Sequence, residues 1–388
     1  MGCVERIYLD HAATTATRPE AIAAMTAVLG NDYNPSSLHA EGRAARAVLD
    51  GARVAVARVL GAKPREIIFT AGGSEADNLA IRGIARARVR AGRHLITTVI
   101  EHHAVLHAFD ALEADGWTVT RLGVDANGQV SADDLRAALR PGTTLVSVGL
   151  ANNEVGAIAP IAELAALAHA AGALFHTDAV QAPGQLPLSV DALGVDALAL
   201  SGHKFCAPKG VGVLYVRAGT PIAAQIAGGG QEHGLRAGTE NLAGIAALAT
   251  ALELADAERP AFVARVGALR DELASGARAS IPGIRINAAG APRLPNNLSL
   301  AFDDAPGDLL LLRLDLEGIA ASAGSACAAG SLEPSHVIAA LGLPAAAARN
   351  VIRFSLGRTT TADSIDRVLA CLPEIVRGAR TGSNLHPV

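Results

Sequence analysis

Over residues 44–216 of this 388-residue chain, segments whose apolar residues recur at helical spacing alternate with short, continuous apolar runs. Stretches that are apolar along one face predict helices over residues 43–60, over residues 131–140 and over residues 161–171. Ser131 suits the N-cap of the second helix, and Gly61 and Gly172 end the other two. Short apolar runs that predict buried strands lie around these helices, at residues 66–70, 95–100, 143–150, 173–177, 195–200 and 211–216.

Strands that alternate with helices predict an α/β fold with a doubly wound, mostly parallel sheet covered on both faces. Its ligand is expected at the carboxyl ends of the strands. After residue 256 the pattern changes, and one face of a helix is marked by Phe262, Val266, Leu269 and Leu273. The chain exceeds the size of a single core, so we expect a large domain over residues 16–255 and a smaller α+β domain over residues 1–15 and 256–388.

Charge and apolarity exclude several classes of function. The formal net charge of −4 provides no basic surface of the kind that binds nucleic acid. The most apolar stretch, residues 242–254, is too short to span a bilayer, and the first ten residues lack the apolar core of a secretory signal. We expect a cytoplasmic protein without direct contact to nucleic acid or membrane. The four cysteines form no disulfide framework and no CxxC metal motif, so reduced thiols are expected at Cys3, Cys206, Cys327 and Cys371.

Polar groups follow three predicted strands at the point where each strand ends. Gly72, Gly73 and Ser74 begin a helix there, so their amides and hydroxyl suit a phosphate, although an ordinary strand-to-helix turn has the same composition. Asp178 suits a buried cationic partner, such as a protonated pyridine nitrogen, or else a helix cap. Lys204 follows a buried strand and is placed among small residues at the sheet's edge, where desolvation favours the neutral amine of a Schiff-base lysine; a solvated surface lysine is the alternative.

Two more residues are candidates because of their surroundings. Residues 351–356 alternate, so Arg353 lies on the face opposite the apolar residues and suits a bidentate grip on a carboxylate; a surface ion pair is the alternative. Cys327 lies within residues 321–331, a stretch of small residues without apolar periodicity. Such a stretch is typical of a loop that carries a thiol into a site, whereas most cysteines are packing residues.

Ten segments, in order and spacing from about residue 7 to 360, resemble one family. They are LDHAATT, NPSSLH, AGGSEADN, EHHAVL, ANNEVG, FHTDAVQA, SGHK, RAGTEN, GSAC and SLEPSH. The chain thus resembles the cysteine desulfurases of the NifS/IscS branch, among the fold-type I enzymes that use pyridoxal 5'-phosphate (PLP). The resemblance implies a seven-stranded sheet, a homodimer, L-cysteine as substrate, and a sulfur-acceptor protein such as an iron–sulfur scaffold.

The resemblance also implies a role for individual residues. Lys204 holds PLP covalently and later moves protons, Asp178 pairs with the pyridine nitrogen, and His102 stacks on the ring. Arg353, with Asn153, binds the substrate, and Cys327 takes up its sulfur as a persulfide. The remaining cofactor contacts are Asn153 and Gln181 near the ring oxygen, and Gly73, Ser74, Ser201, His203 and the partner subunit's Thr239 at the phosphate.

One departure from the family pattern is the cysteine stretch, where Ala323, Ala328 and Ala329 replace hydroxyl residues. The order of that loop and its handling of the persulfide are therefore open. A selenocysteine lyase or an aminotransferase on the same fold is the nearest alternative, and a non-catalytic sulfur carrier is the second; the latter predicts loss of Lys204 or Cys327, and both are present. The sequence does not identify the acceptor, since iron–sulfur cluster assembly and thio-modification of nucleic acid both use such enzymes.

Overall fold

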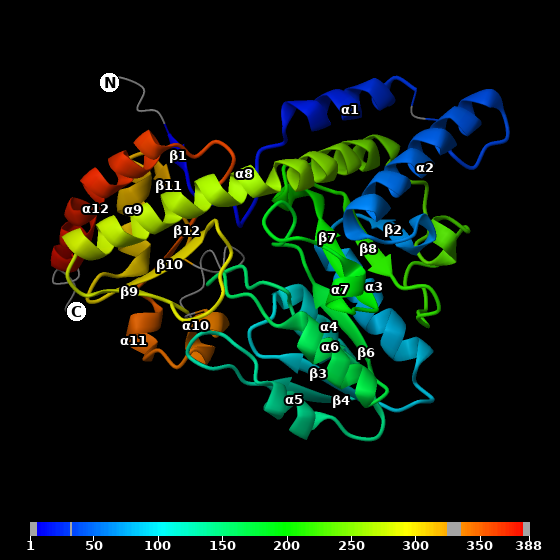
Figure 1. The fold of residues 1–388 in the computed structure, drawn as a ribbon, viewed down its shortest axis with the longest axis horizontal. Coiled ribbons are helices and arrows are strands. Elements are labelled where there is room, and N and C mark those ends of the chain that lie inside the picture. Colours follow the sequence, from blue (N-terminus) through cyan, green and yellow to red (C-terminus); the bar gives the residue numbers. More distant parts are fainter. Residues whose placement is uncertain (1–5, 32, 324–334, 383–388) are drawn as a thin grey trace.

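The computed structural model describes residues 6–31, 33–323 and 335–382. Its large part is built on a seven-stranded sheet in the order β2-β8-β7-β6-β5-β3-β4 (Figure 1). β8 is antiparallel to both neighbours, and every other pair is parallel, so the expected mostly parallel sheet is confirmed. The strands are β2 (Ile67–Thr70), β3 (His94–Thr98), β4 (Thr118–Leu122), β5 (Thr143–Ser147), β6 (Leu174–Asp178), β7 (Ala197–Ser201) and β8 (Gly212–Val216).

The sequence pattern predicts six of these strands and misses β4. β4 lies at the edge of the sheet, so Leu122 is its only fully buried residue and the strand lacks an apolar run. The other strands are buried on both faces. Consecutive residues point to opposite sides, as in β7, where Leu198 and Leu200 belong to one hydrophobic cluster and Ala199 to another.

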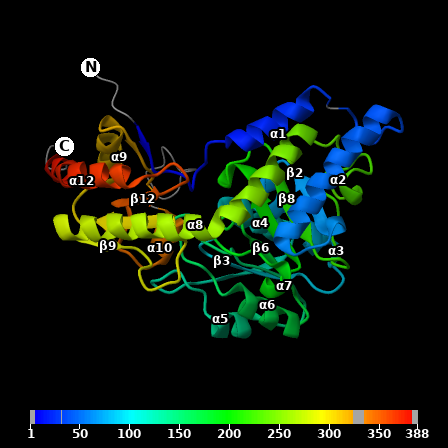
Figure 2. The same ribbon diagram turned by 45° about the horizontal axis from the view of Figure 1, so that its top comes forward.

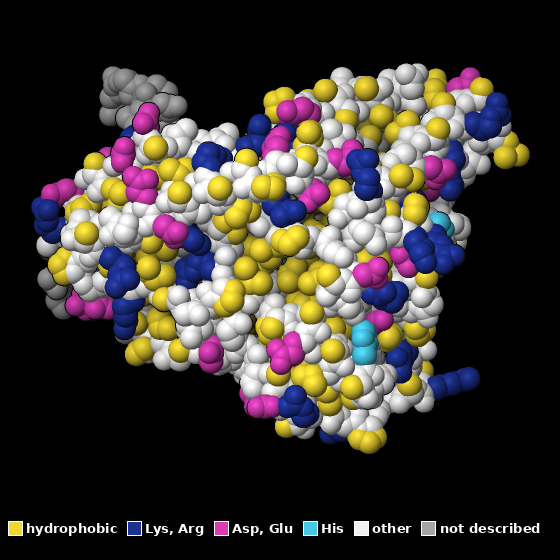
Figure 3. Space-filling view, viewed as in Figure 1, with side chains coloured by type: hydrophobic (Ala, Val, Ile, Leu, Met, Phe, Trp, Pro, Cys, Tyr) yellow, Lys and Arg dark blue, Asp and Glu magenta, His cyan; other side chains and the backbone are white. Residues whose placement is uncertain are grey.

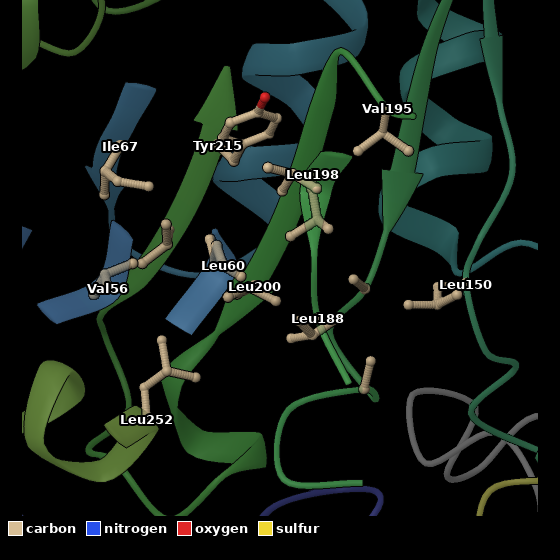
Figure 4. Close-up of a cluster of buried hydrophobic side chains, with 14 of the residues drawn as sticks. Val56, Leu60, Ile67, Leu150, Leu188, Val195, Leu198, Leu200, Tyr215 and Leu252 are labelled. Atoms are coloured by element: carbon tan, nitrogen blue, oxygen red, sulfur yellow. The ribbon is translucent and has the colours of Figure 1, made fainter. Parts of the chain in front are cut away.

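Helices cover both faces of the sheet. On one face α2, α6 and the first part of α8 enclose the cluster of Figure 4, where Val56, Leu60 and Leu252 meet strand residues such as Leu198. On the other face α3 and α4 pack against the opposite side chains. Ser131 caps α5 as expected, because its Oγ accepts from the amides of Asp133 and Asp134. The helices of this part are α1 (Pro19–Leu29), α2 (Ala40–Leu60), α3 (Gly73–Ala87), α4 (His103–Ala114), α5 (Ala132–Ala138), α6 (Ile161–Ala170), α7 (Val190–Leu193) and the 3-10 turns η1 (Pro64–Glu66), η2 (Gly202–Lys204) and η3 (Glu232–Gly234).

A second, smaller core lies beside the first and is centred on an antiparallel sheet of three strands. β10 (Asn297–Phe302) pairs with β9 (Ile284–Ile286) and β12 (Val351–Ser355). The N-terminal strand joins this part, since β1 (Ile7–Tyr8) pairs with β11 (Ile319–Ala320). Its helices are α9 (Gly307–Leu316), α10 (His336–Ala340), α11 (Ala345–Ala348) and α12 (Ala362–Gly382).

The long helix α8 (Leu242–Ser280) belongs to both cores. Its first part packs into the large cluster up to Leu252, and Val266, Leu269 and Leu273 pack into the small one. Figures 1 and 2 show the helix crossing from one part to the other. The helix is therefore continuous through residue 256, where the sequence pattern changes; the division into two domains at that point stays a prediction.

The surface in Figure 3 carries Lys and Arg side chains interspersed with Asp and Glu, so this face has no broad basic area. Over the described ranges, no helix is both long and apolar enough to span a bilayer.

Candidate active site

A cavity of about 310 Å³ is lined by residues at the carboxyl edge of the large sheet. The strands β2, β3, β5, β6 and β7 all end at this edge because they run in the same direction. Of the twelve predicted site residues, Thr239 is exposed outside the cavity, and Cys327 lies outside the described residues. The ten that line the cavity are Gly73, Ser74, His102, Asn153, Asp178, Gln181, Ser201, His203, Lys204 and Arg353.

The end of the cavity at α3 forms a recess for a small anionic group. Gly73 begins this 15-residue helix, whose first turn presents backbone N–H groups. A Cβ on Gly73 would lie 2.8 Å from Cγ2 of Val180 and 3.4 Å from Cβ of Ser201. A larger residue would therefore fill the recess, and the hydroxyls of Ser74 and Ser201 add donors beside it.

His203 lies next to this recess in η2. Its Nδ1 is 3.1 Å from Oγ1 of Thr14. Burial, and then the positive charges of Lys204 and Lys209, lower the pKa of His203 to about 4. The ring is therefore neutral at pH 7, and it would bind an anion through hydrogen bonds and not through charge.

Lys204 points at the backbone of the segment that follows β1. Its Nζ donates to the carbonyl oxygens of Ala12 and Ala13, at 2.6 and 2.8 Å. Nε2 of Gln181 donates to the same Ala12 oxygen, at 3.0 Å. The amine of Lys204 is thus held at the wall of the cavity by backbone carbonyl groups from near the N-terminus.

Three carboxyl groups line one side of the cavity. Asp178 ends β6, and its Oδ1 accepts from the amide of Val180 at 2.9 Å. Burial raises the pKa of Asp178, while His102, the Val180 amide and Lys204 act against this rise. Burial, and then the charge of Asp178, raises the pKa of Asp77 well above its usual range. Burial likewise raises the pKa of Glu101 to about 7. Carboxyl groups this close do not all ionise, and Asp178 is the one on which nearby His102 and Lys204 favour the charged form.

His102 precedes α4 and serves as its N-cap. Its Nδ1 accepts from the amide of Ala104 at 3.1 Å, which fixes the ring relative to the helix. Burial is the largest influence and lowers the pKa of His102. A neutral ring can stack on a cationic aromatic group without charge repulsion, so its predicted role is physically consistent.

Arg353 is buried in β12, with 1% of its surface exposed, so the surface ion pair considered from the sequence is wrong. One terminal nitrogen donates to Oδ1 of Asp10 at 2.7 Å and the other to the carbonyl oxygen of Asn153 at 2.9 Å. These bonds fix the guanidinium at the cavity wall. Its remaining N–H groups leave capacity for a substrate carboxylate.

Several lining residues were not assigned from the sequence. They include the carboxyl groups of Asp77, Glu101 and Glu154, and the imidazole of His336. Each lies inside a segment that carries the family resemblance, so the sequence indicates that the residue is near the site but not what its side chain does there. The burial that raises the pKa of the three carboxyl groups comes from packing, which the sequence pattern alone does not reveal.

The cavity fits PLP, which has a phosphate, a pyridine nitrogen and an aldehyde. The recess at Gly73 suits the phosphate, because a Cβ there would occupy it. The carboxylate of Asp178 suits the pyridine nitrogen, and the amine of Lys204 suits the aldehyde. Within the described ranges, no group of three or more His, Cys, Asp or Glu residues is placed to hold a metal ion.

The aminotransferase class-V family matches residues 7–368. Cysteine desulfurase IscS of Dictyoglomus turgidum is 47% identical over 97% of this chain and 95% of its own length. The solved structure of a NifS-like protein superposes with a TM-score of 0.90 at 36% identity, covering 96% of this chain and 100% of that one. The structure of SspA in complex with cysteine has a TM-score of 0.81 at 36% identity and covers 90% of this chain and 98% of that one.

Fold and site together define a PLP-dependent enzyme of fold type I. The chain belongs to the class V aminotransferase family, and within it to the cysteine desulfurases of the NifS/IscS branch.

Proposed function

We propose that the protein removes the sulfur atom from L-cysteine, releases L-alanine, and passes the sulfur through Cys327 to an acceptor. The observation that carries the proposal is the meeting of Lys204, Asp178 and Arg353, from three separate elements, on one cavity. These are the three groups that an enzyme acting on an amino acid through PLP needs: an amine, a carboxylate and a guanidinium. SspA, a structural neighbour, was solved with cysteine bound, which supports the choice of substrate.

The residues around the cavity would hold the cofactor at both ends. When bound, PLP withdraws electrons from the carbon atoms of the substrate. Lys204 would bind the aldehyde, and its Nζ would then take the proton from the substrate's Cα. Asp178 would keep the pyridine nitrogen protonated, since Lys204 and the protonated nitrogen itself would favour its charged form. The other cofactor contacts of the proposal are Gly73, Ser74, His102, Asn153, Gln181, Ser201 and His203.

Arg353 would orient the substrate through its α-carboxylate. The bonds to Asp10 and to the carbonyl of Asn153 hold the guanidinium before substrate arrives, so little side-chain entropy is lost on binding. Nε of Arg353 is buried and has no partner within the described part of the chain. The carboxylate would supply acceptors at this point.

Sulfur transfer would be carried out by the thiolate of Cys327. Its Sγ attacks the substrate's sulfur, a sulfur–sulfur bond forms, and the substrate's bond between Cβ and sulfur breaks. The electron pair stays with the carbon fragment, which is protonated and leaves as alanine. In sum, L-cysteine and a thiol give L-alanine and a persulfide, so no outside oxidant is required.

Both described flanks of the cysteine segment contact residues that line the cavity. Before it, Ser322 pairs through its backbone with Arg353, and after it, Ser335 contacts Glu154. Cys327 lies between these two flanks in the sequence, which supports its assignment as the sulfur-accepting thiol.

The enzyme would act as a homodimer in which Thr239 completes the partner's phosphate site. Thr239 is exposed and lies outside the cavity of its own chain. The acceptor would be a protein of iron–sulfur cluster assembly or of nucleic acid thio-modification. A cytoplasmic location suits a reaction that needs a reduced thiol. The division at residues 255 and 256 would separate a cofactor domain from one that carries Cys327.

One assay tests the central claim. Purified protein is incubated with L-cysteine while alanine and sulfide are measured together, in the presence of a reducing thiol. Equal amounts of the two products are expected. 3-Mercaptopyruvate in place of alanine would identify an aminotransferase, and activity with L-selenocysteine alone would identify a selenocysteine lyase. Borohydride reduction followed by peptide mapping should label Lys204 and no other lysine, and Lys204→Ala should abolish the label.

A further inference from the structure

A second cavity, of about 70 Å³, shares Gln181 and Lys204 with the first one. Its other walls include the segment after β1, α8 at Phe262, and the chain just before β10, at Asn296. Because α8 passes from the large core to the small core (Figure 1), the cavity lies where the two cores meet. Lys204 therefore borders two cavities, of which the proposed function uses only the first.

Three side chains that line this cavity have buried polar atoms without a hydrogen-bond partner among the described residues. These atoms are both ring nitrogens of His11, Oε1 of Gln185 and Oδ1 of Asn296. Each of the three residues has more than nine-tenths of its surface buried. Buried polar atoms in proteins are almost always bonded to protein or to ordered water. We therefore expect their partner inside the cavity that they share.

The hydrogen-bonding capacity of these groups defines what the cavity can bind. Burial lowers the pKa of His11 to about 4, against a smaller opposite effect of the Tyr8 backbone, so the ring is neutral at pH 7. A neutral ring has one N–H donor and one acceptor nitrogen. The amide nitrogens of Gln185 and Asn296 already donate to backbone carbonyl oxygens, at 3.1 and 3.2 Å, which leaves their side-chain oxygens as acceptors. A suitable ligand must therefore both donate and accept.

Water meets this requirement, and the size of the cavity suits it. One water molecule needs about 10–15 Å³ of such space, so several fit, whereas a cavity that binds benzene has about 150 Å³. Arg18 and Glu258 also line the cavity, and the Glu258 side chain is 46% exposed. The cavity therefore continues to the surface of the protein.

We propose, on the basis of the function proposed above, that His11, Gln185 and Asn296 bind water in this cavity, and that this water exchanges protons with Lys204. Lys204 would take the proton of the substrate's Cα as an ammonium group, release one of its three hydrogens as a proton to the water, and receive a solvent proton in return. Atoms and charge balance, and no further reactant is required. Cofactor and substrate would fill the first cavity and exclude water there, whereas the second cavity stays open to solvent. The hydrogen that reaches alanine would therefore come from solvent.

The water site is tested without substrate. A crystal structure of the PLP-loaded protein should show ordered water within hydrogen-bonding distance of at least two of the three side chains. His11→Phe removes both ring nitrogens but keeps a ring against Gly357, where a Cβ would collide with the His11 ring. Removal of unpaired buried nitrogens would raise the midpoint of urea unfolding, whereas removal of nitrogens that bind water leaves the midpoint unchanged or lowers it. We expect the second result.

The exchange role is tested by the isotope content of the product. The substrate is L-cysteine deuterated at Cα, the solvent is ordinary water, and alanine is analysed by mass. Wild-type alanine should contain almost no deuterium, whereas alanine from His11→Phe should retain up to about one third, since the deuteron shares the ammonium group with two hydrogens. His11→Gln, which keeps a polar side chain, and Phe262→Leu, which alters an apolar wall of the same cavity, should give the wild-type result. If His11→Phe does not fold, Gln185→Met removes another of the acceptors in its place.

A cavity without ordered water, together with a higher urea midpoint for His11→Phe, would overturn the water site. Equal deuterium retention in wild type and His11→Phe would overturn the exchange role. A wild-type protein that forms no alanine from L-cysteine would refute the proposed function, and the exchange role with it. The crystal structure and the urea midpoint involve no substrate, so failure of the water site and failure of the proposed function are distinguishable.

Discussion

Replacing Asp178 by Asn is the sharpest test of how the site holds its cofactor. The side chain keeps its size, and its Oδ1 can still accept from the amide of Val180. The change removes the acidic group from a position enclosed by protein, with the cationic Lys204 nearby. A carboxylate stabilises a protonated pyridine nitrogen there, and an amide does not.

The magnitude follows from the burial. Once the cofactor covers Asp178, the carboxylate and the pyridine nitrogen form a buried ion pair, and loss of one partner of such a pair costs about 3–5 kcal/mol. At about 1.4 kcal/mol per factor of ten, PLP should bind roughly 140-fold to 3,700-fold more weakly. Alanine formation should fall even at saturating PLP, because an unprotonated ring withdraws electrons less strongly.

Asp77→Asn provides the matched control. Burial and the charge of Asp178 raise the pKa of Asp77 well above its usual range, which favours the neutral form of this carboxyl group. An amide of the same shape should therefore change PLP binding by less than about 1 kcal/mol, roughly fivefold. The assay is equilibrium dialysis against a series of PLP concentrations, with bound cofactor measured by absorbance. Binding by Asp178→Asn within threefold of wild type, or an equal loss in Asp77→Asn, would refute the reasoning.

Three further outcomes are expected. Cys327→Ser should bind PLP and show the absorbance change on adding L-cysteine, but it should form no persulfide, because a hydroxyl is a far weaker nucleophile toward sulfur. Cys206→Ala should remain active, and peptide mapping that finds the persulfide chiefly on Cys206 would contradict this. Burial raises the pKa of Glu101 from 4.5 to about 7, so its contribution to stability is present below pH 4.5 and is lost as the pH rises through 7. Glu101→Gln should therefore melt above wild type at pH 8, by the equivalent of at most about 3 kcal/mol, and match it near pH 4.5; identical melting curves at pH 8 would oppose the assignment. Glu232 holds the buried guanidinium of Arg53 at 2.7 and 2.9 Å, so Glu232→Gln removes its charged partner and should lower the free energy of unfolding by about 3–5 kcal/mol in urea titrations. Glu253→Gln, in an exposed pair, should lower it by less than about 1 kcal/mol, and equal losses would reject this account.

Much of the fold could be predicted from local pattern. The central strands carry continuous apolar runs because both of their faces are buried, so residues such as Leu198 and Ala199 identify them without any tertiary information. The same runs place Asp178 and Lys204 at strand ends, and the common direction of the strands brings those ends together. Edge strand β4 was not predicted because its single buried residue, Leu122, gives no apolar run that would indicate a strand.

The tertiary structure decided what the site residues do to one another. Arg353 and Asp10 are 343 residues apart in the chain, and their bond exists only because β12 and the segment after β1 meet at the cavity. Which carboxyl group favours its charged form is likewise set by packing, since burial raises the pKa of all three groups, Asp77, Glu101 and Asp178, and the charge of Lys204 acts against this rise at Asp178. Apolar periodicity is a property of neighbouring positions along the chain, whereas charge, pairing and pKa depend on groups that only folding brings within a few ångströms. The sequence by itself therefore determined the sheet and the identity of most candidate residues, and the fold alone decided their protonation and their partners.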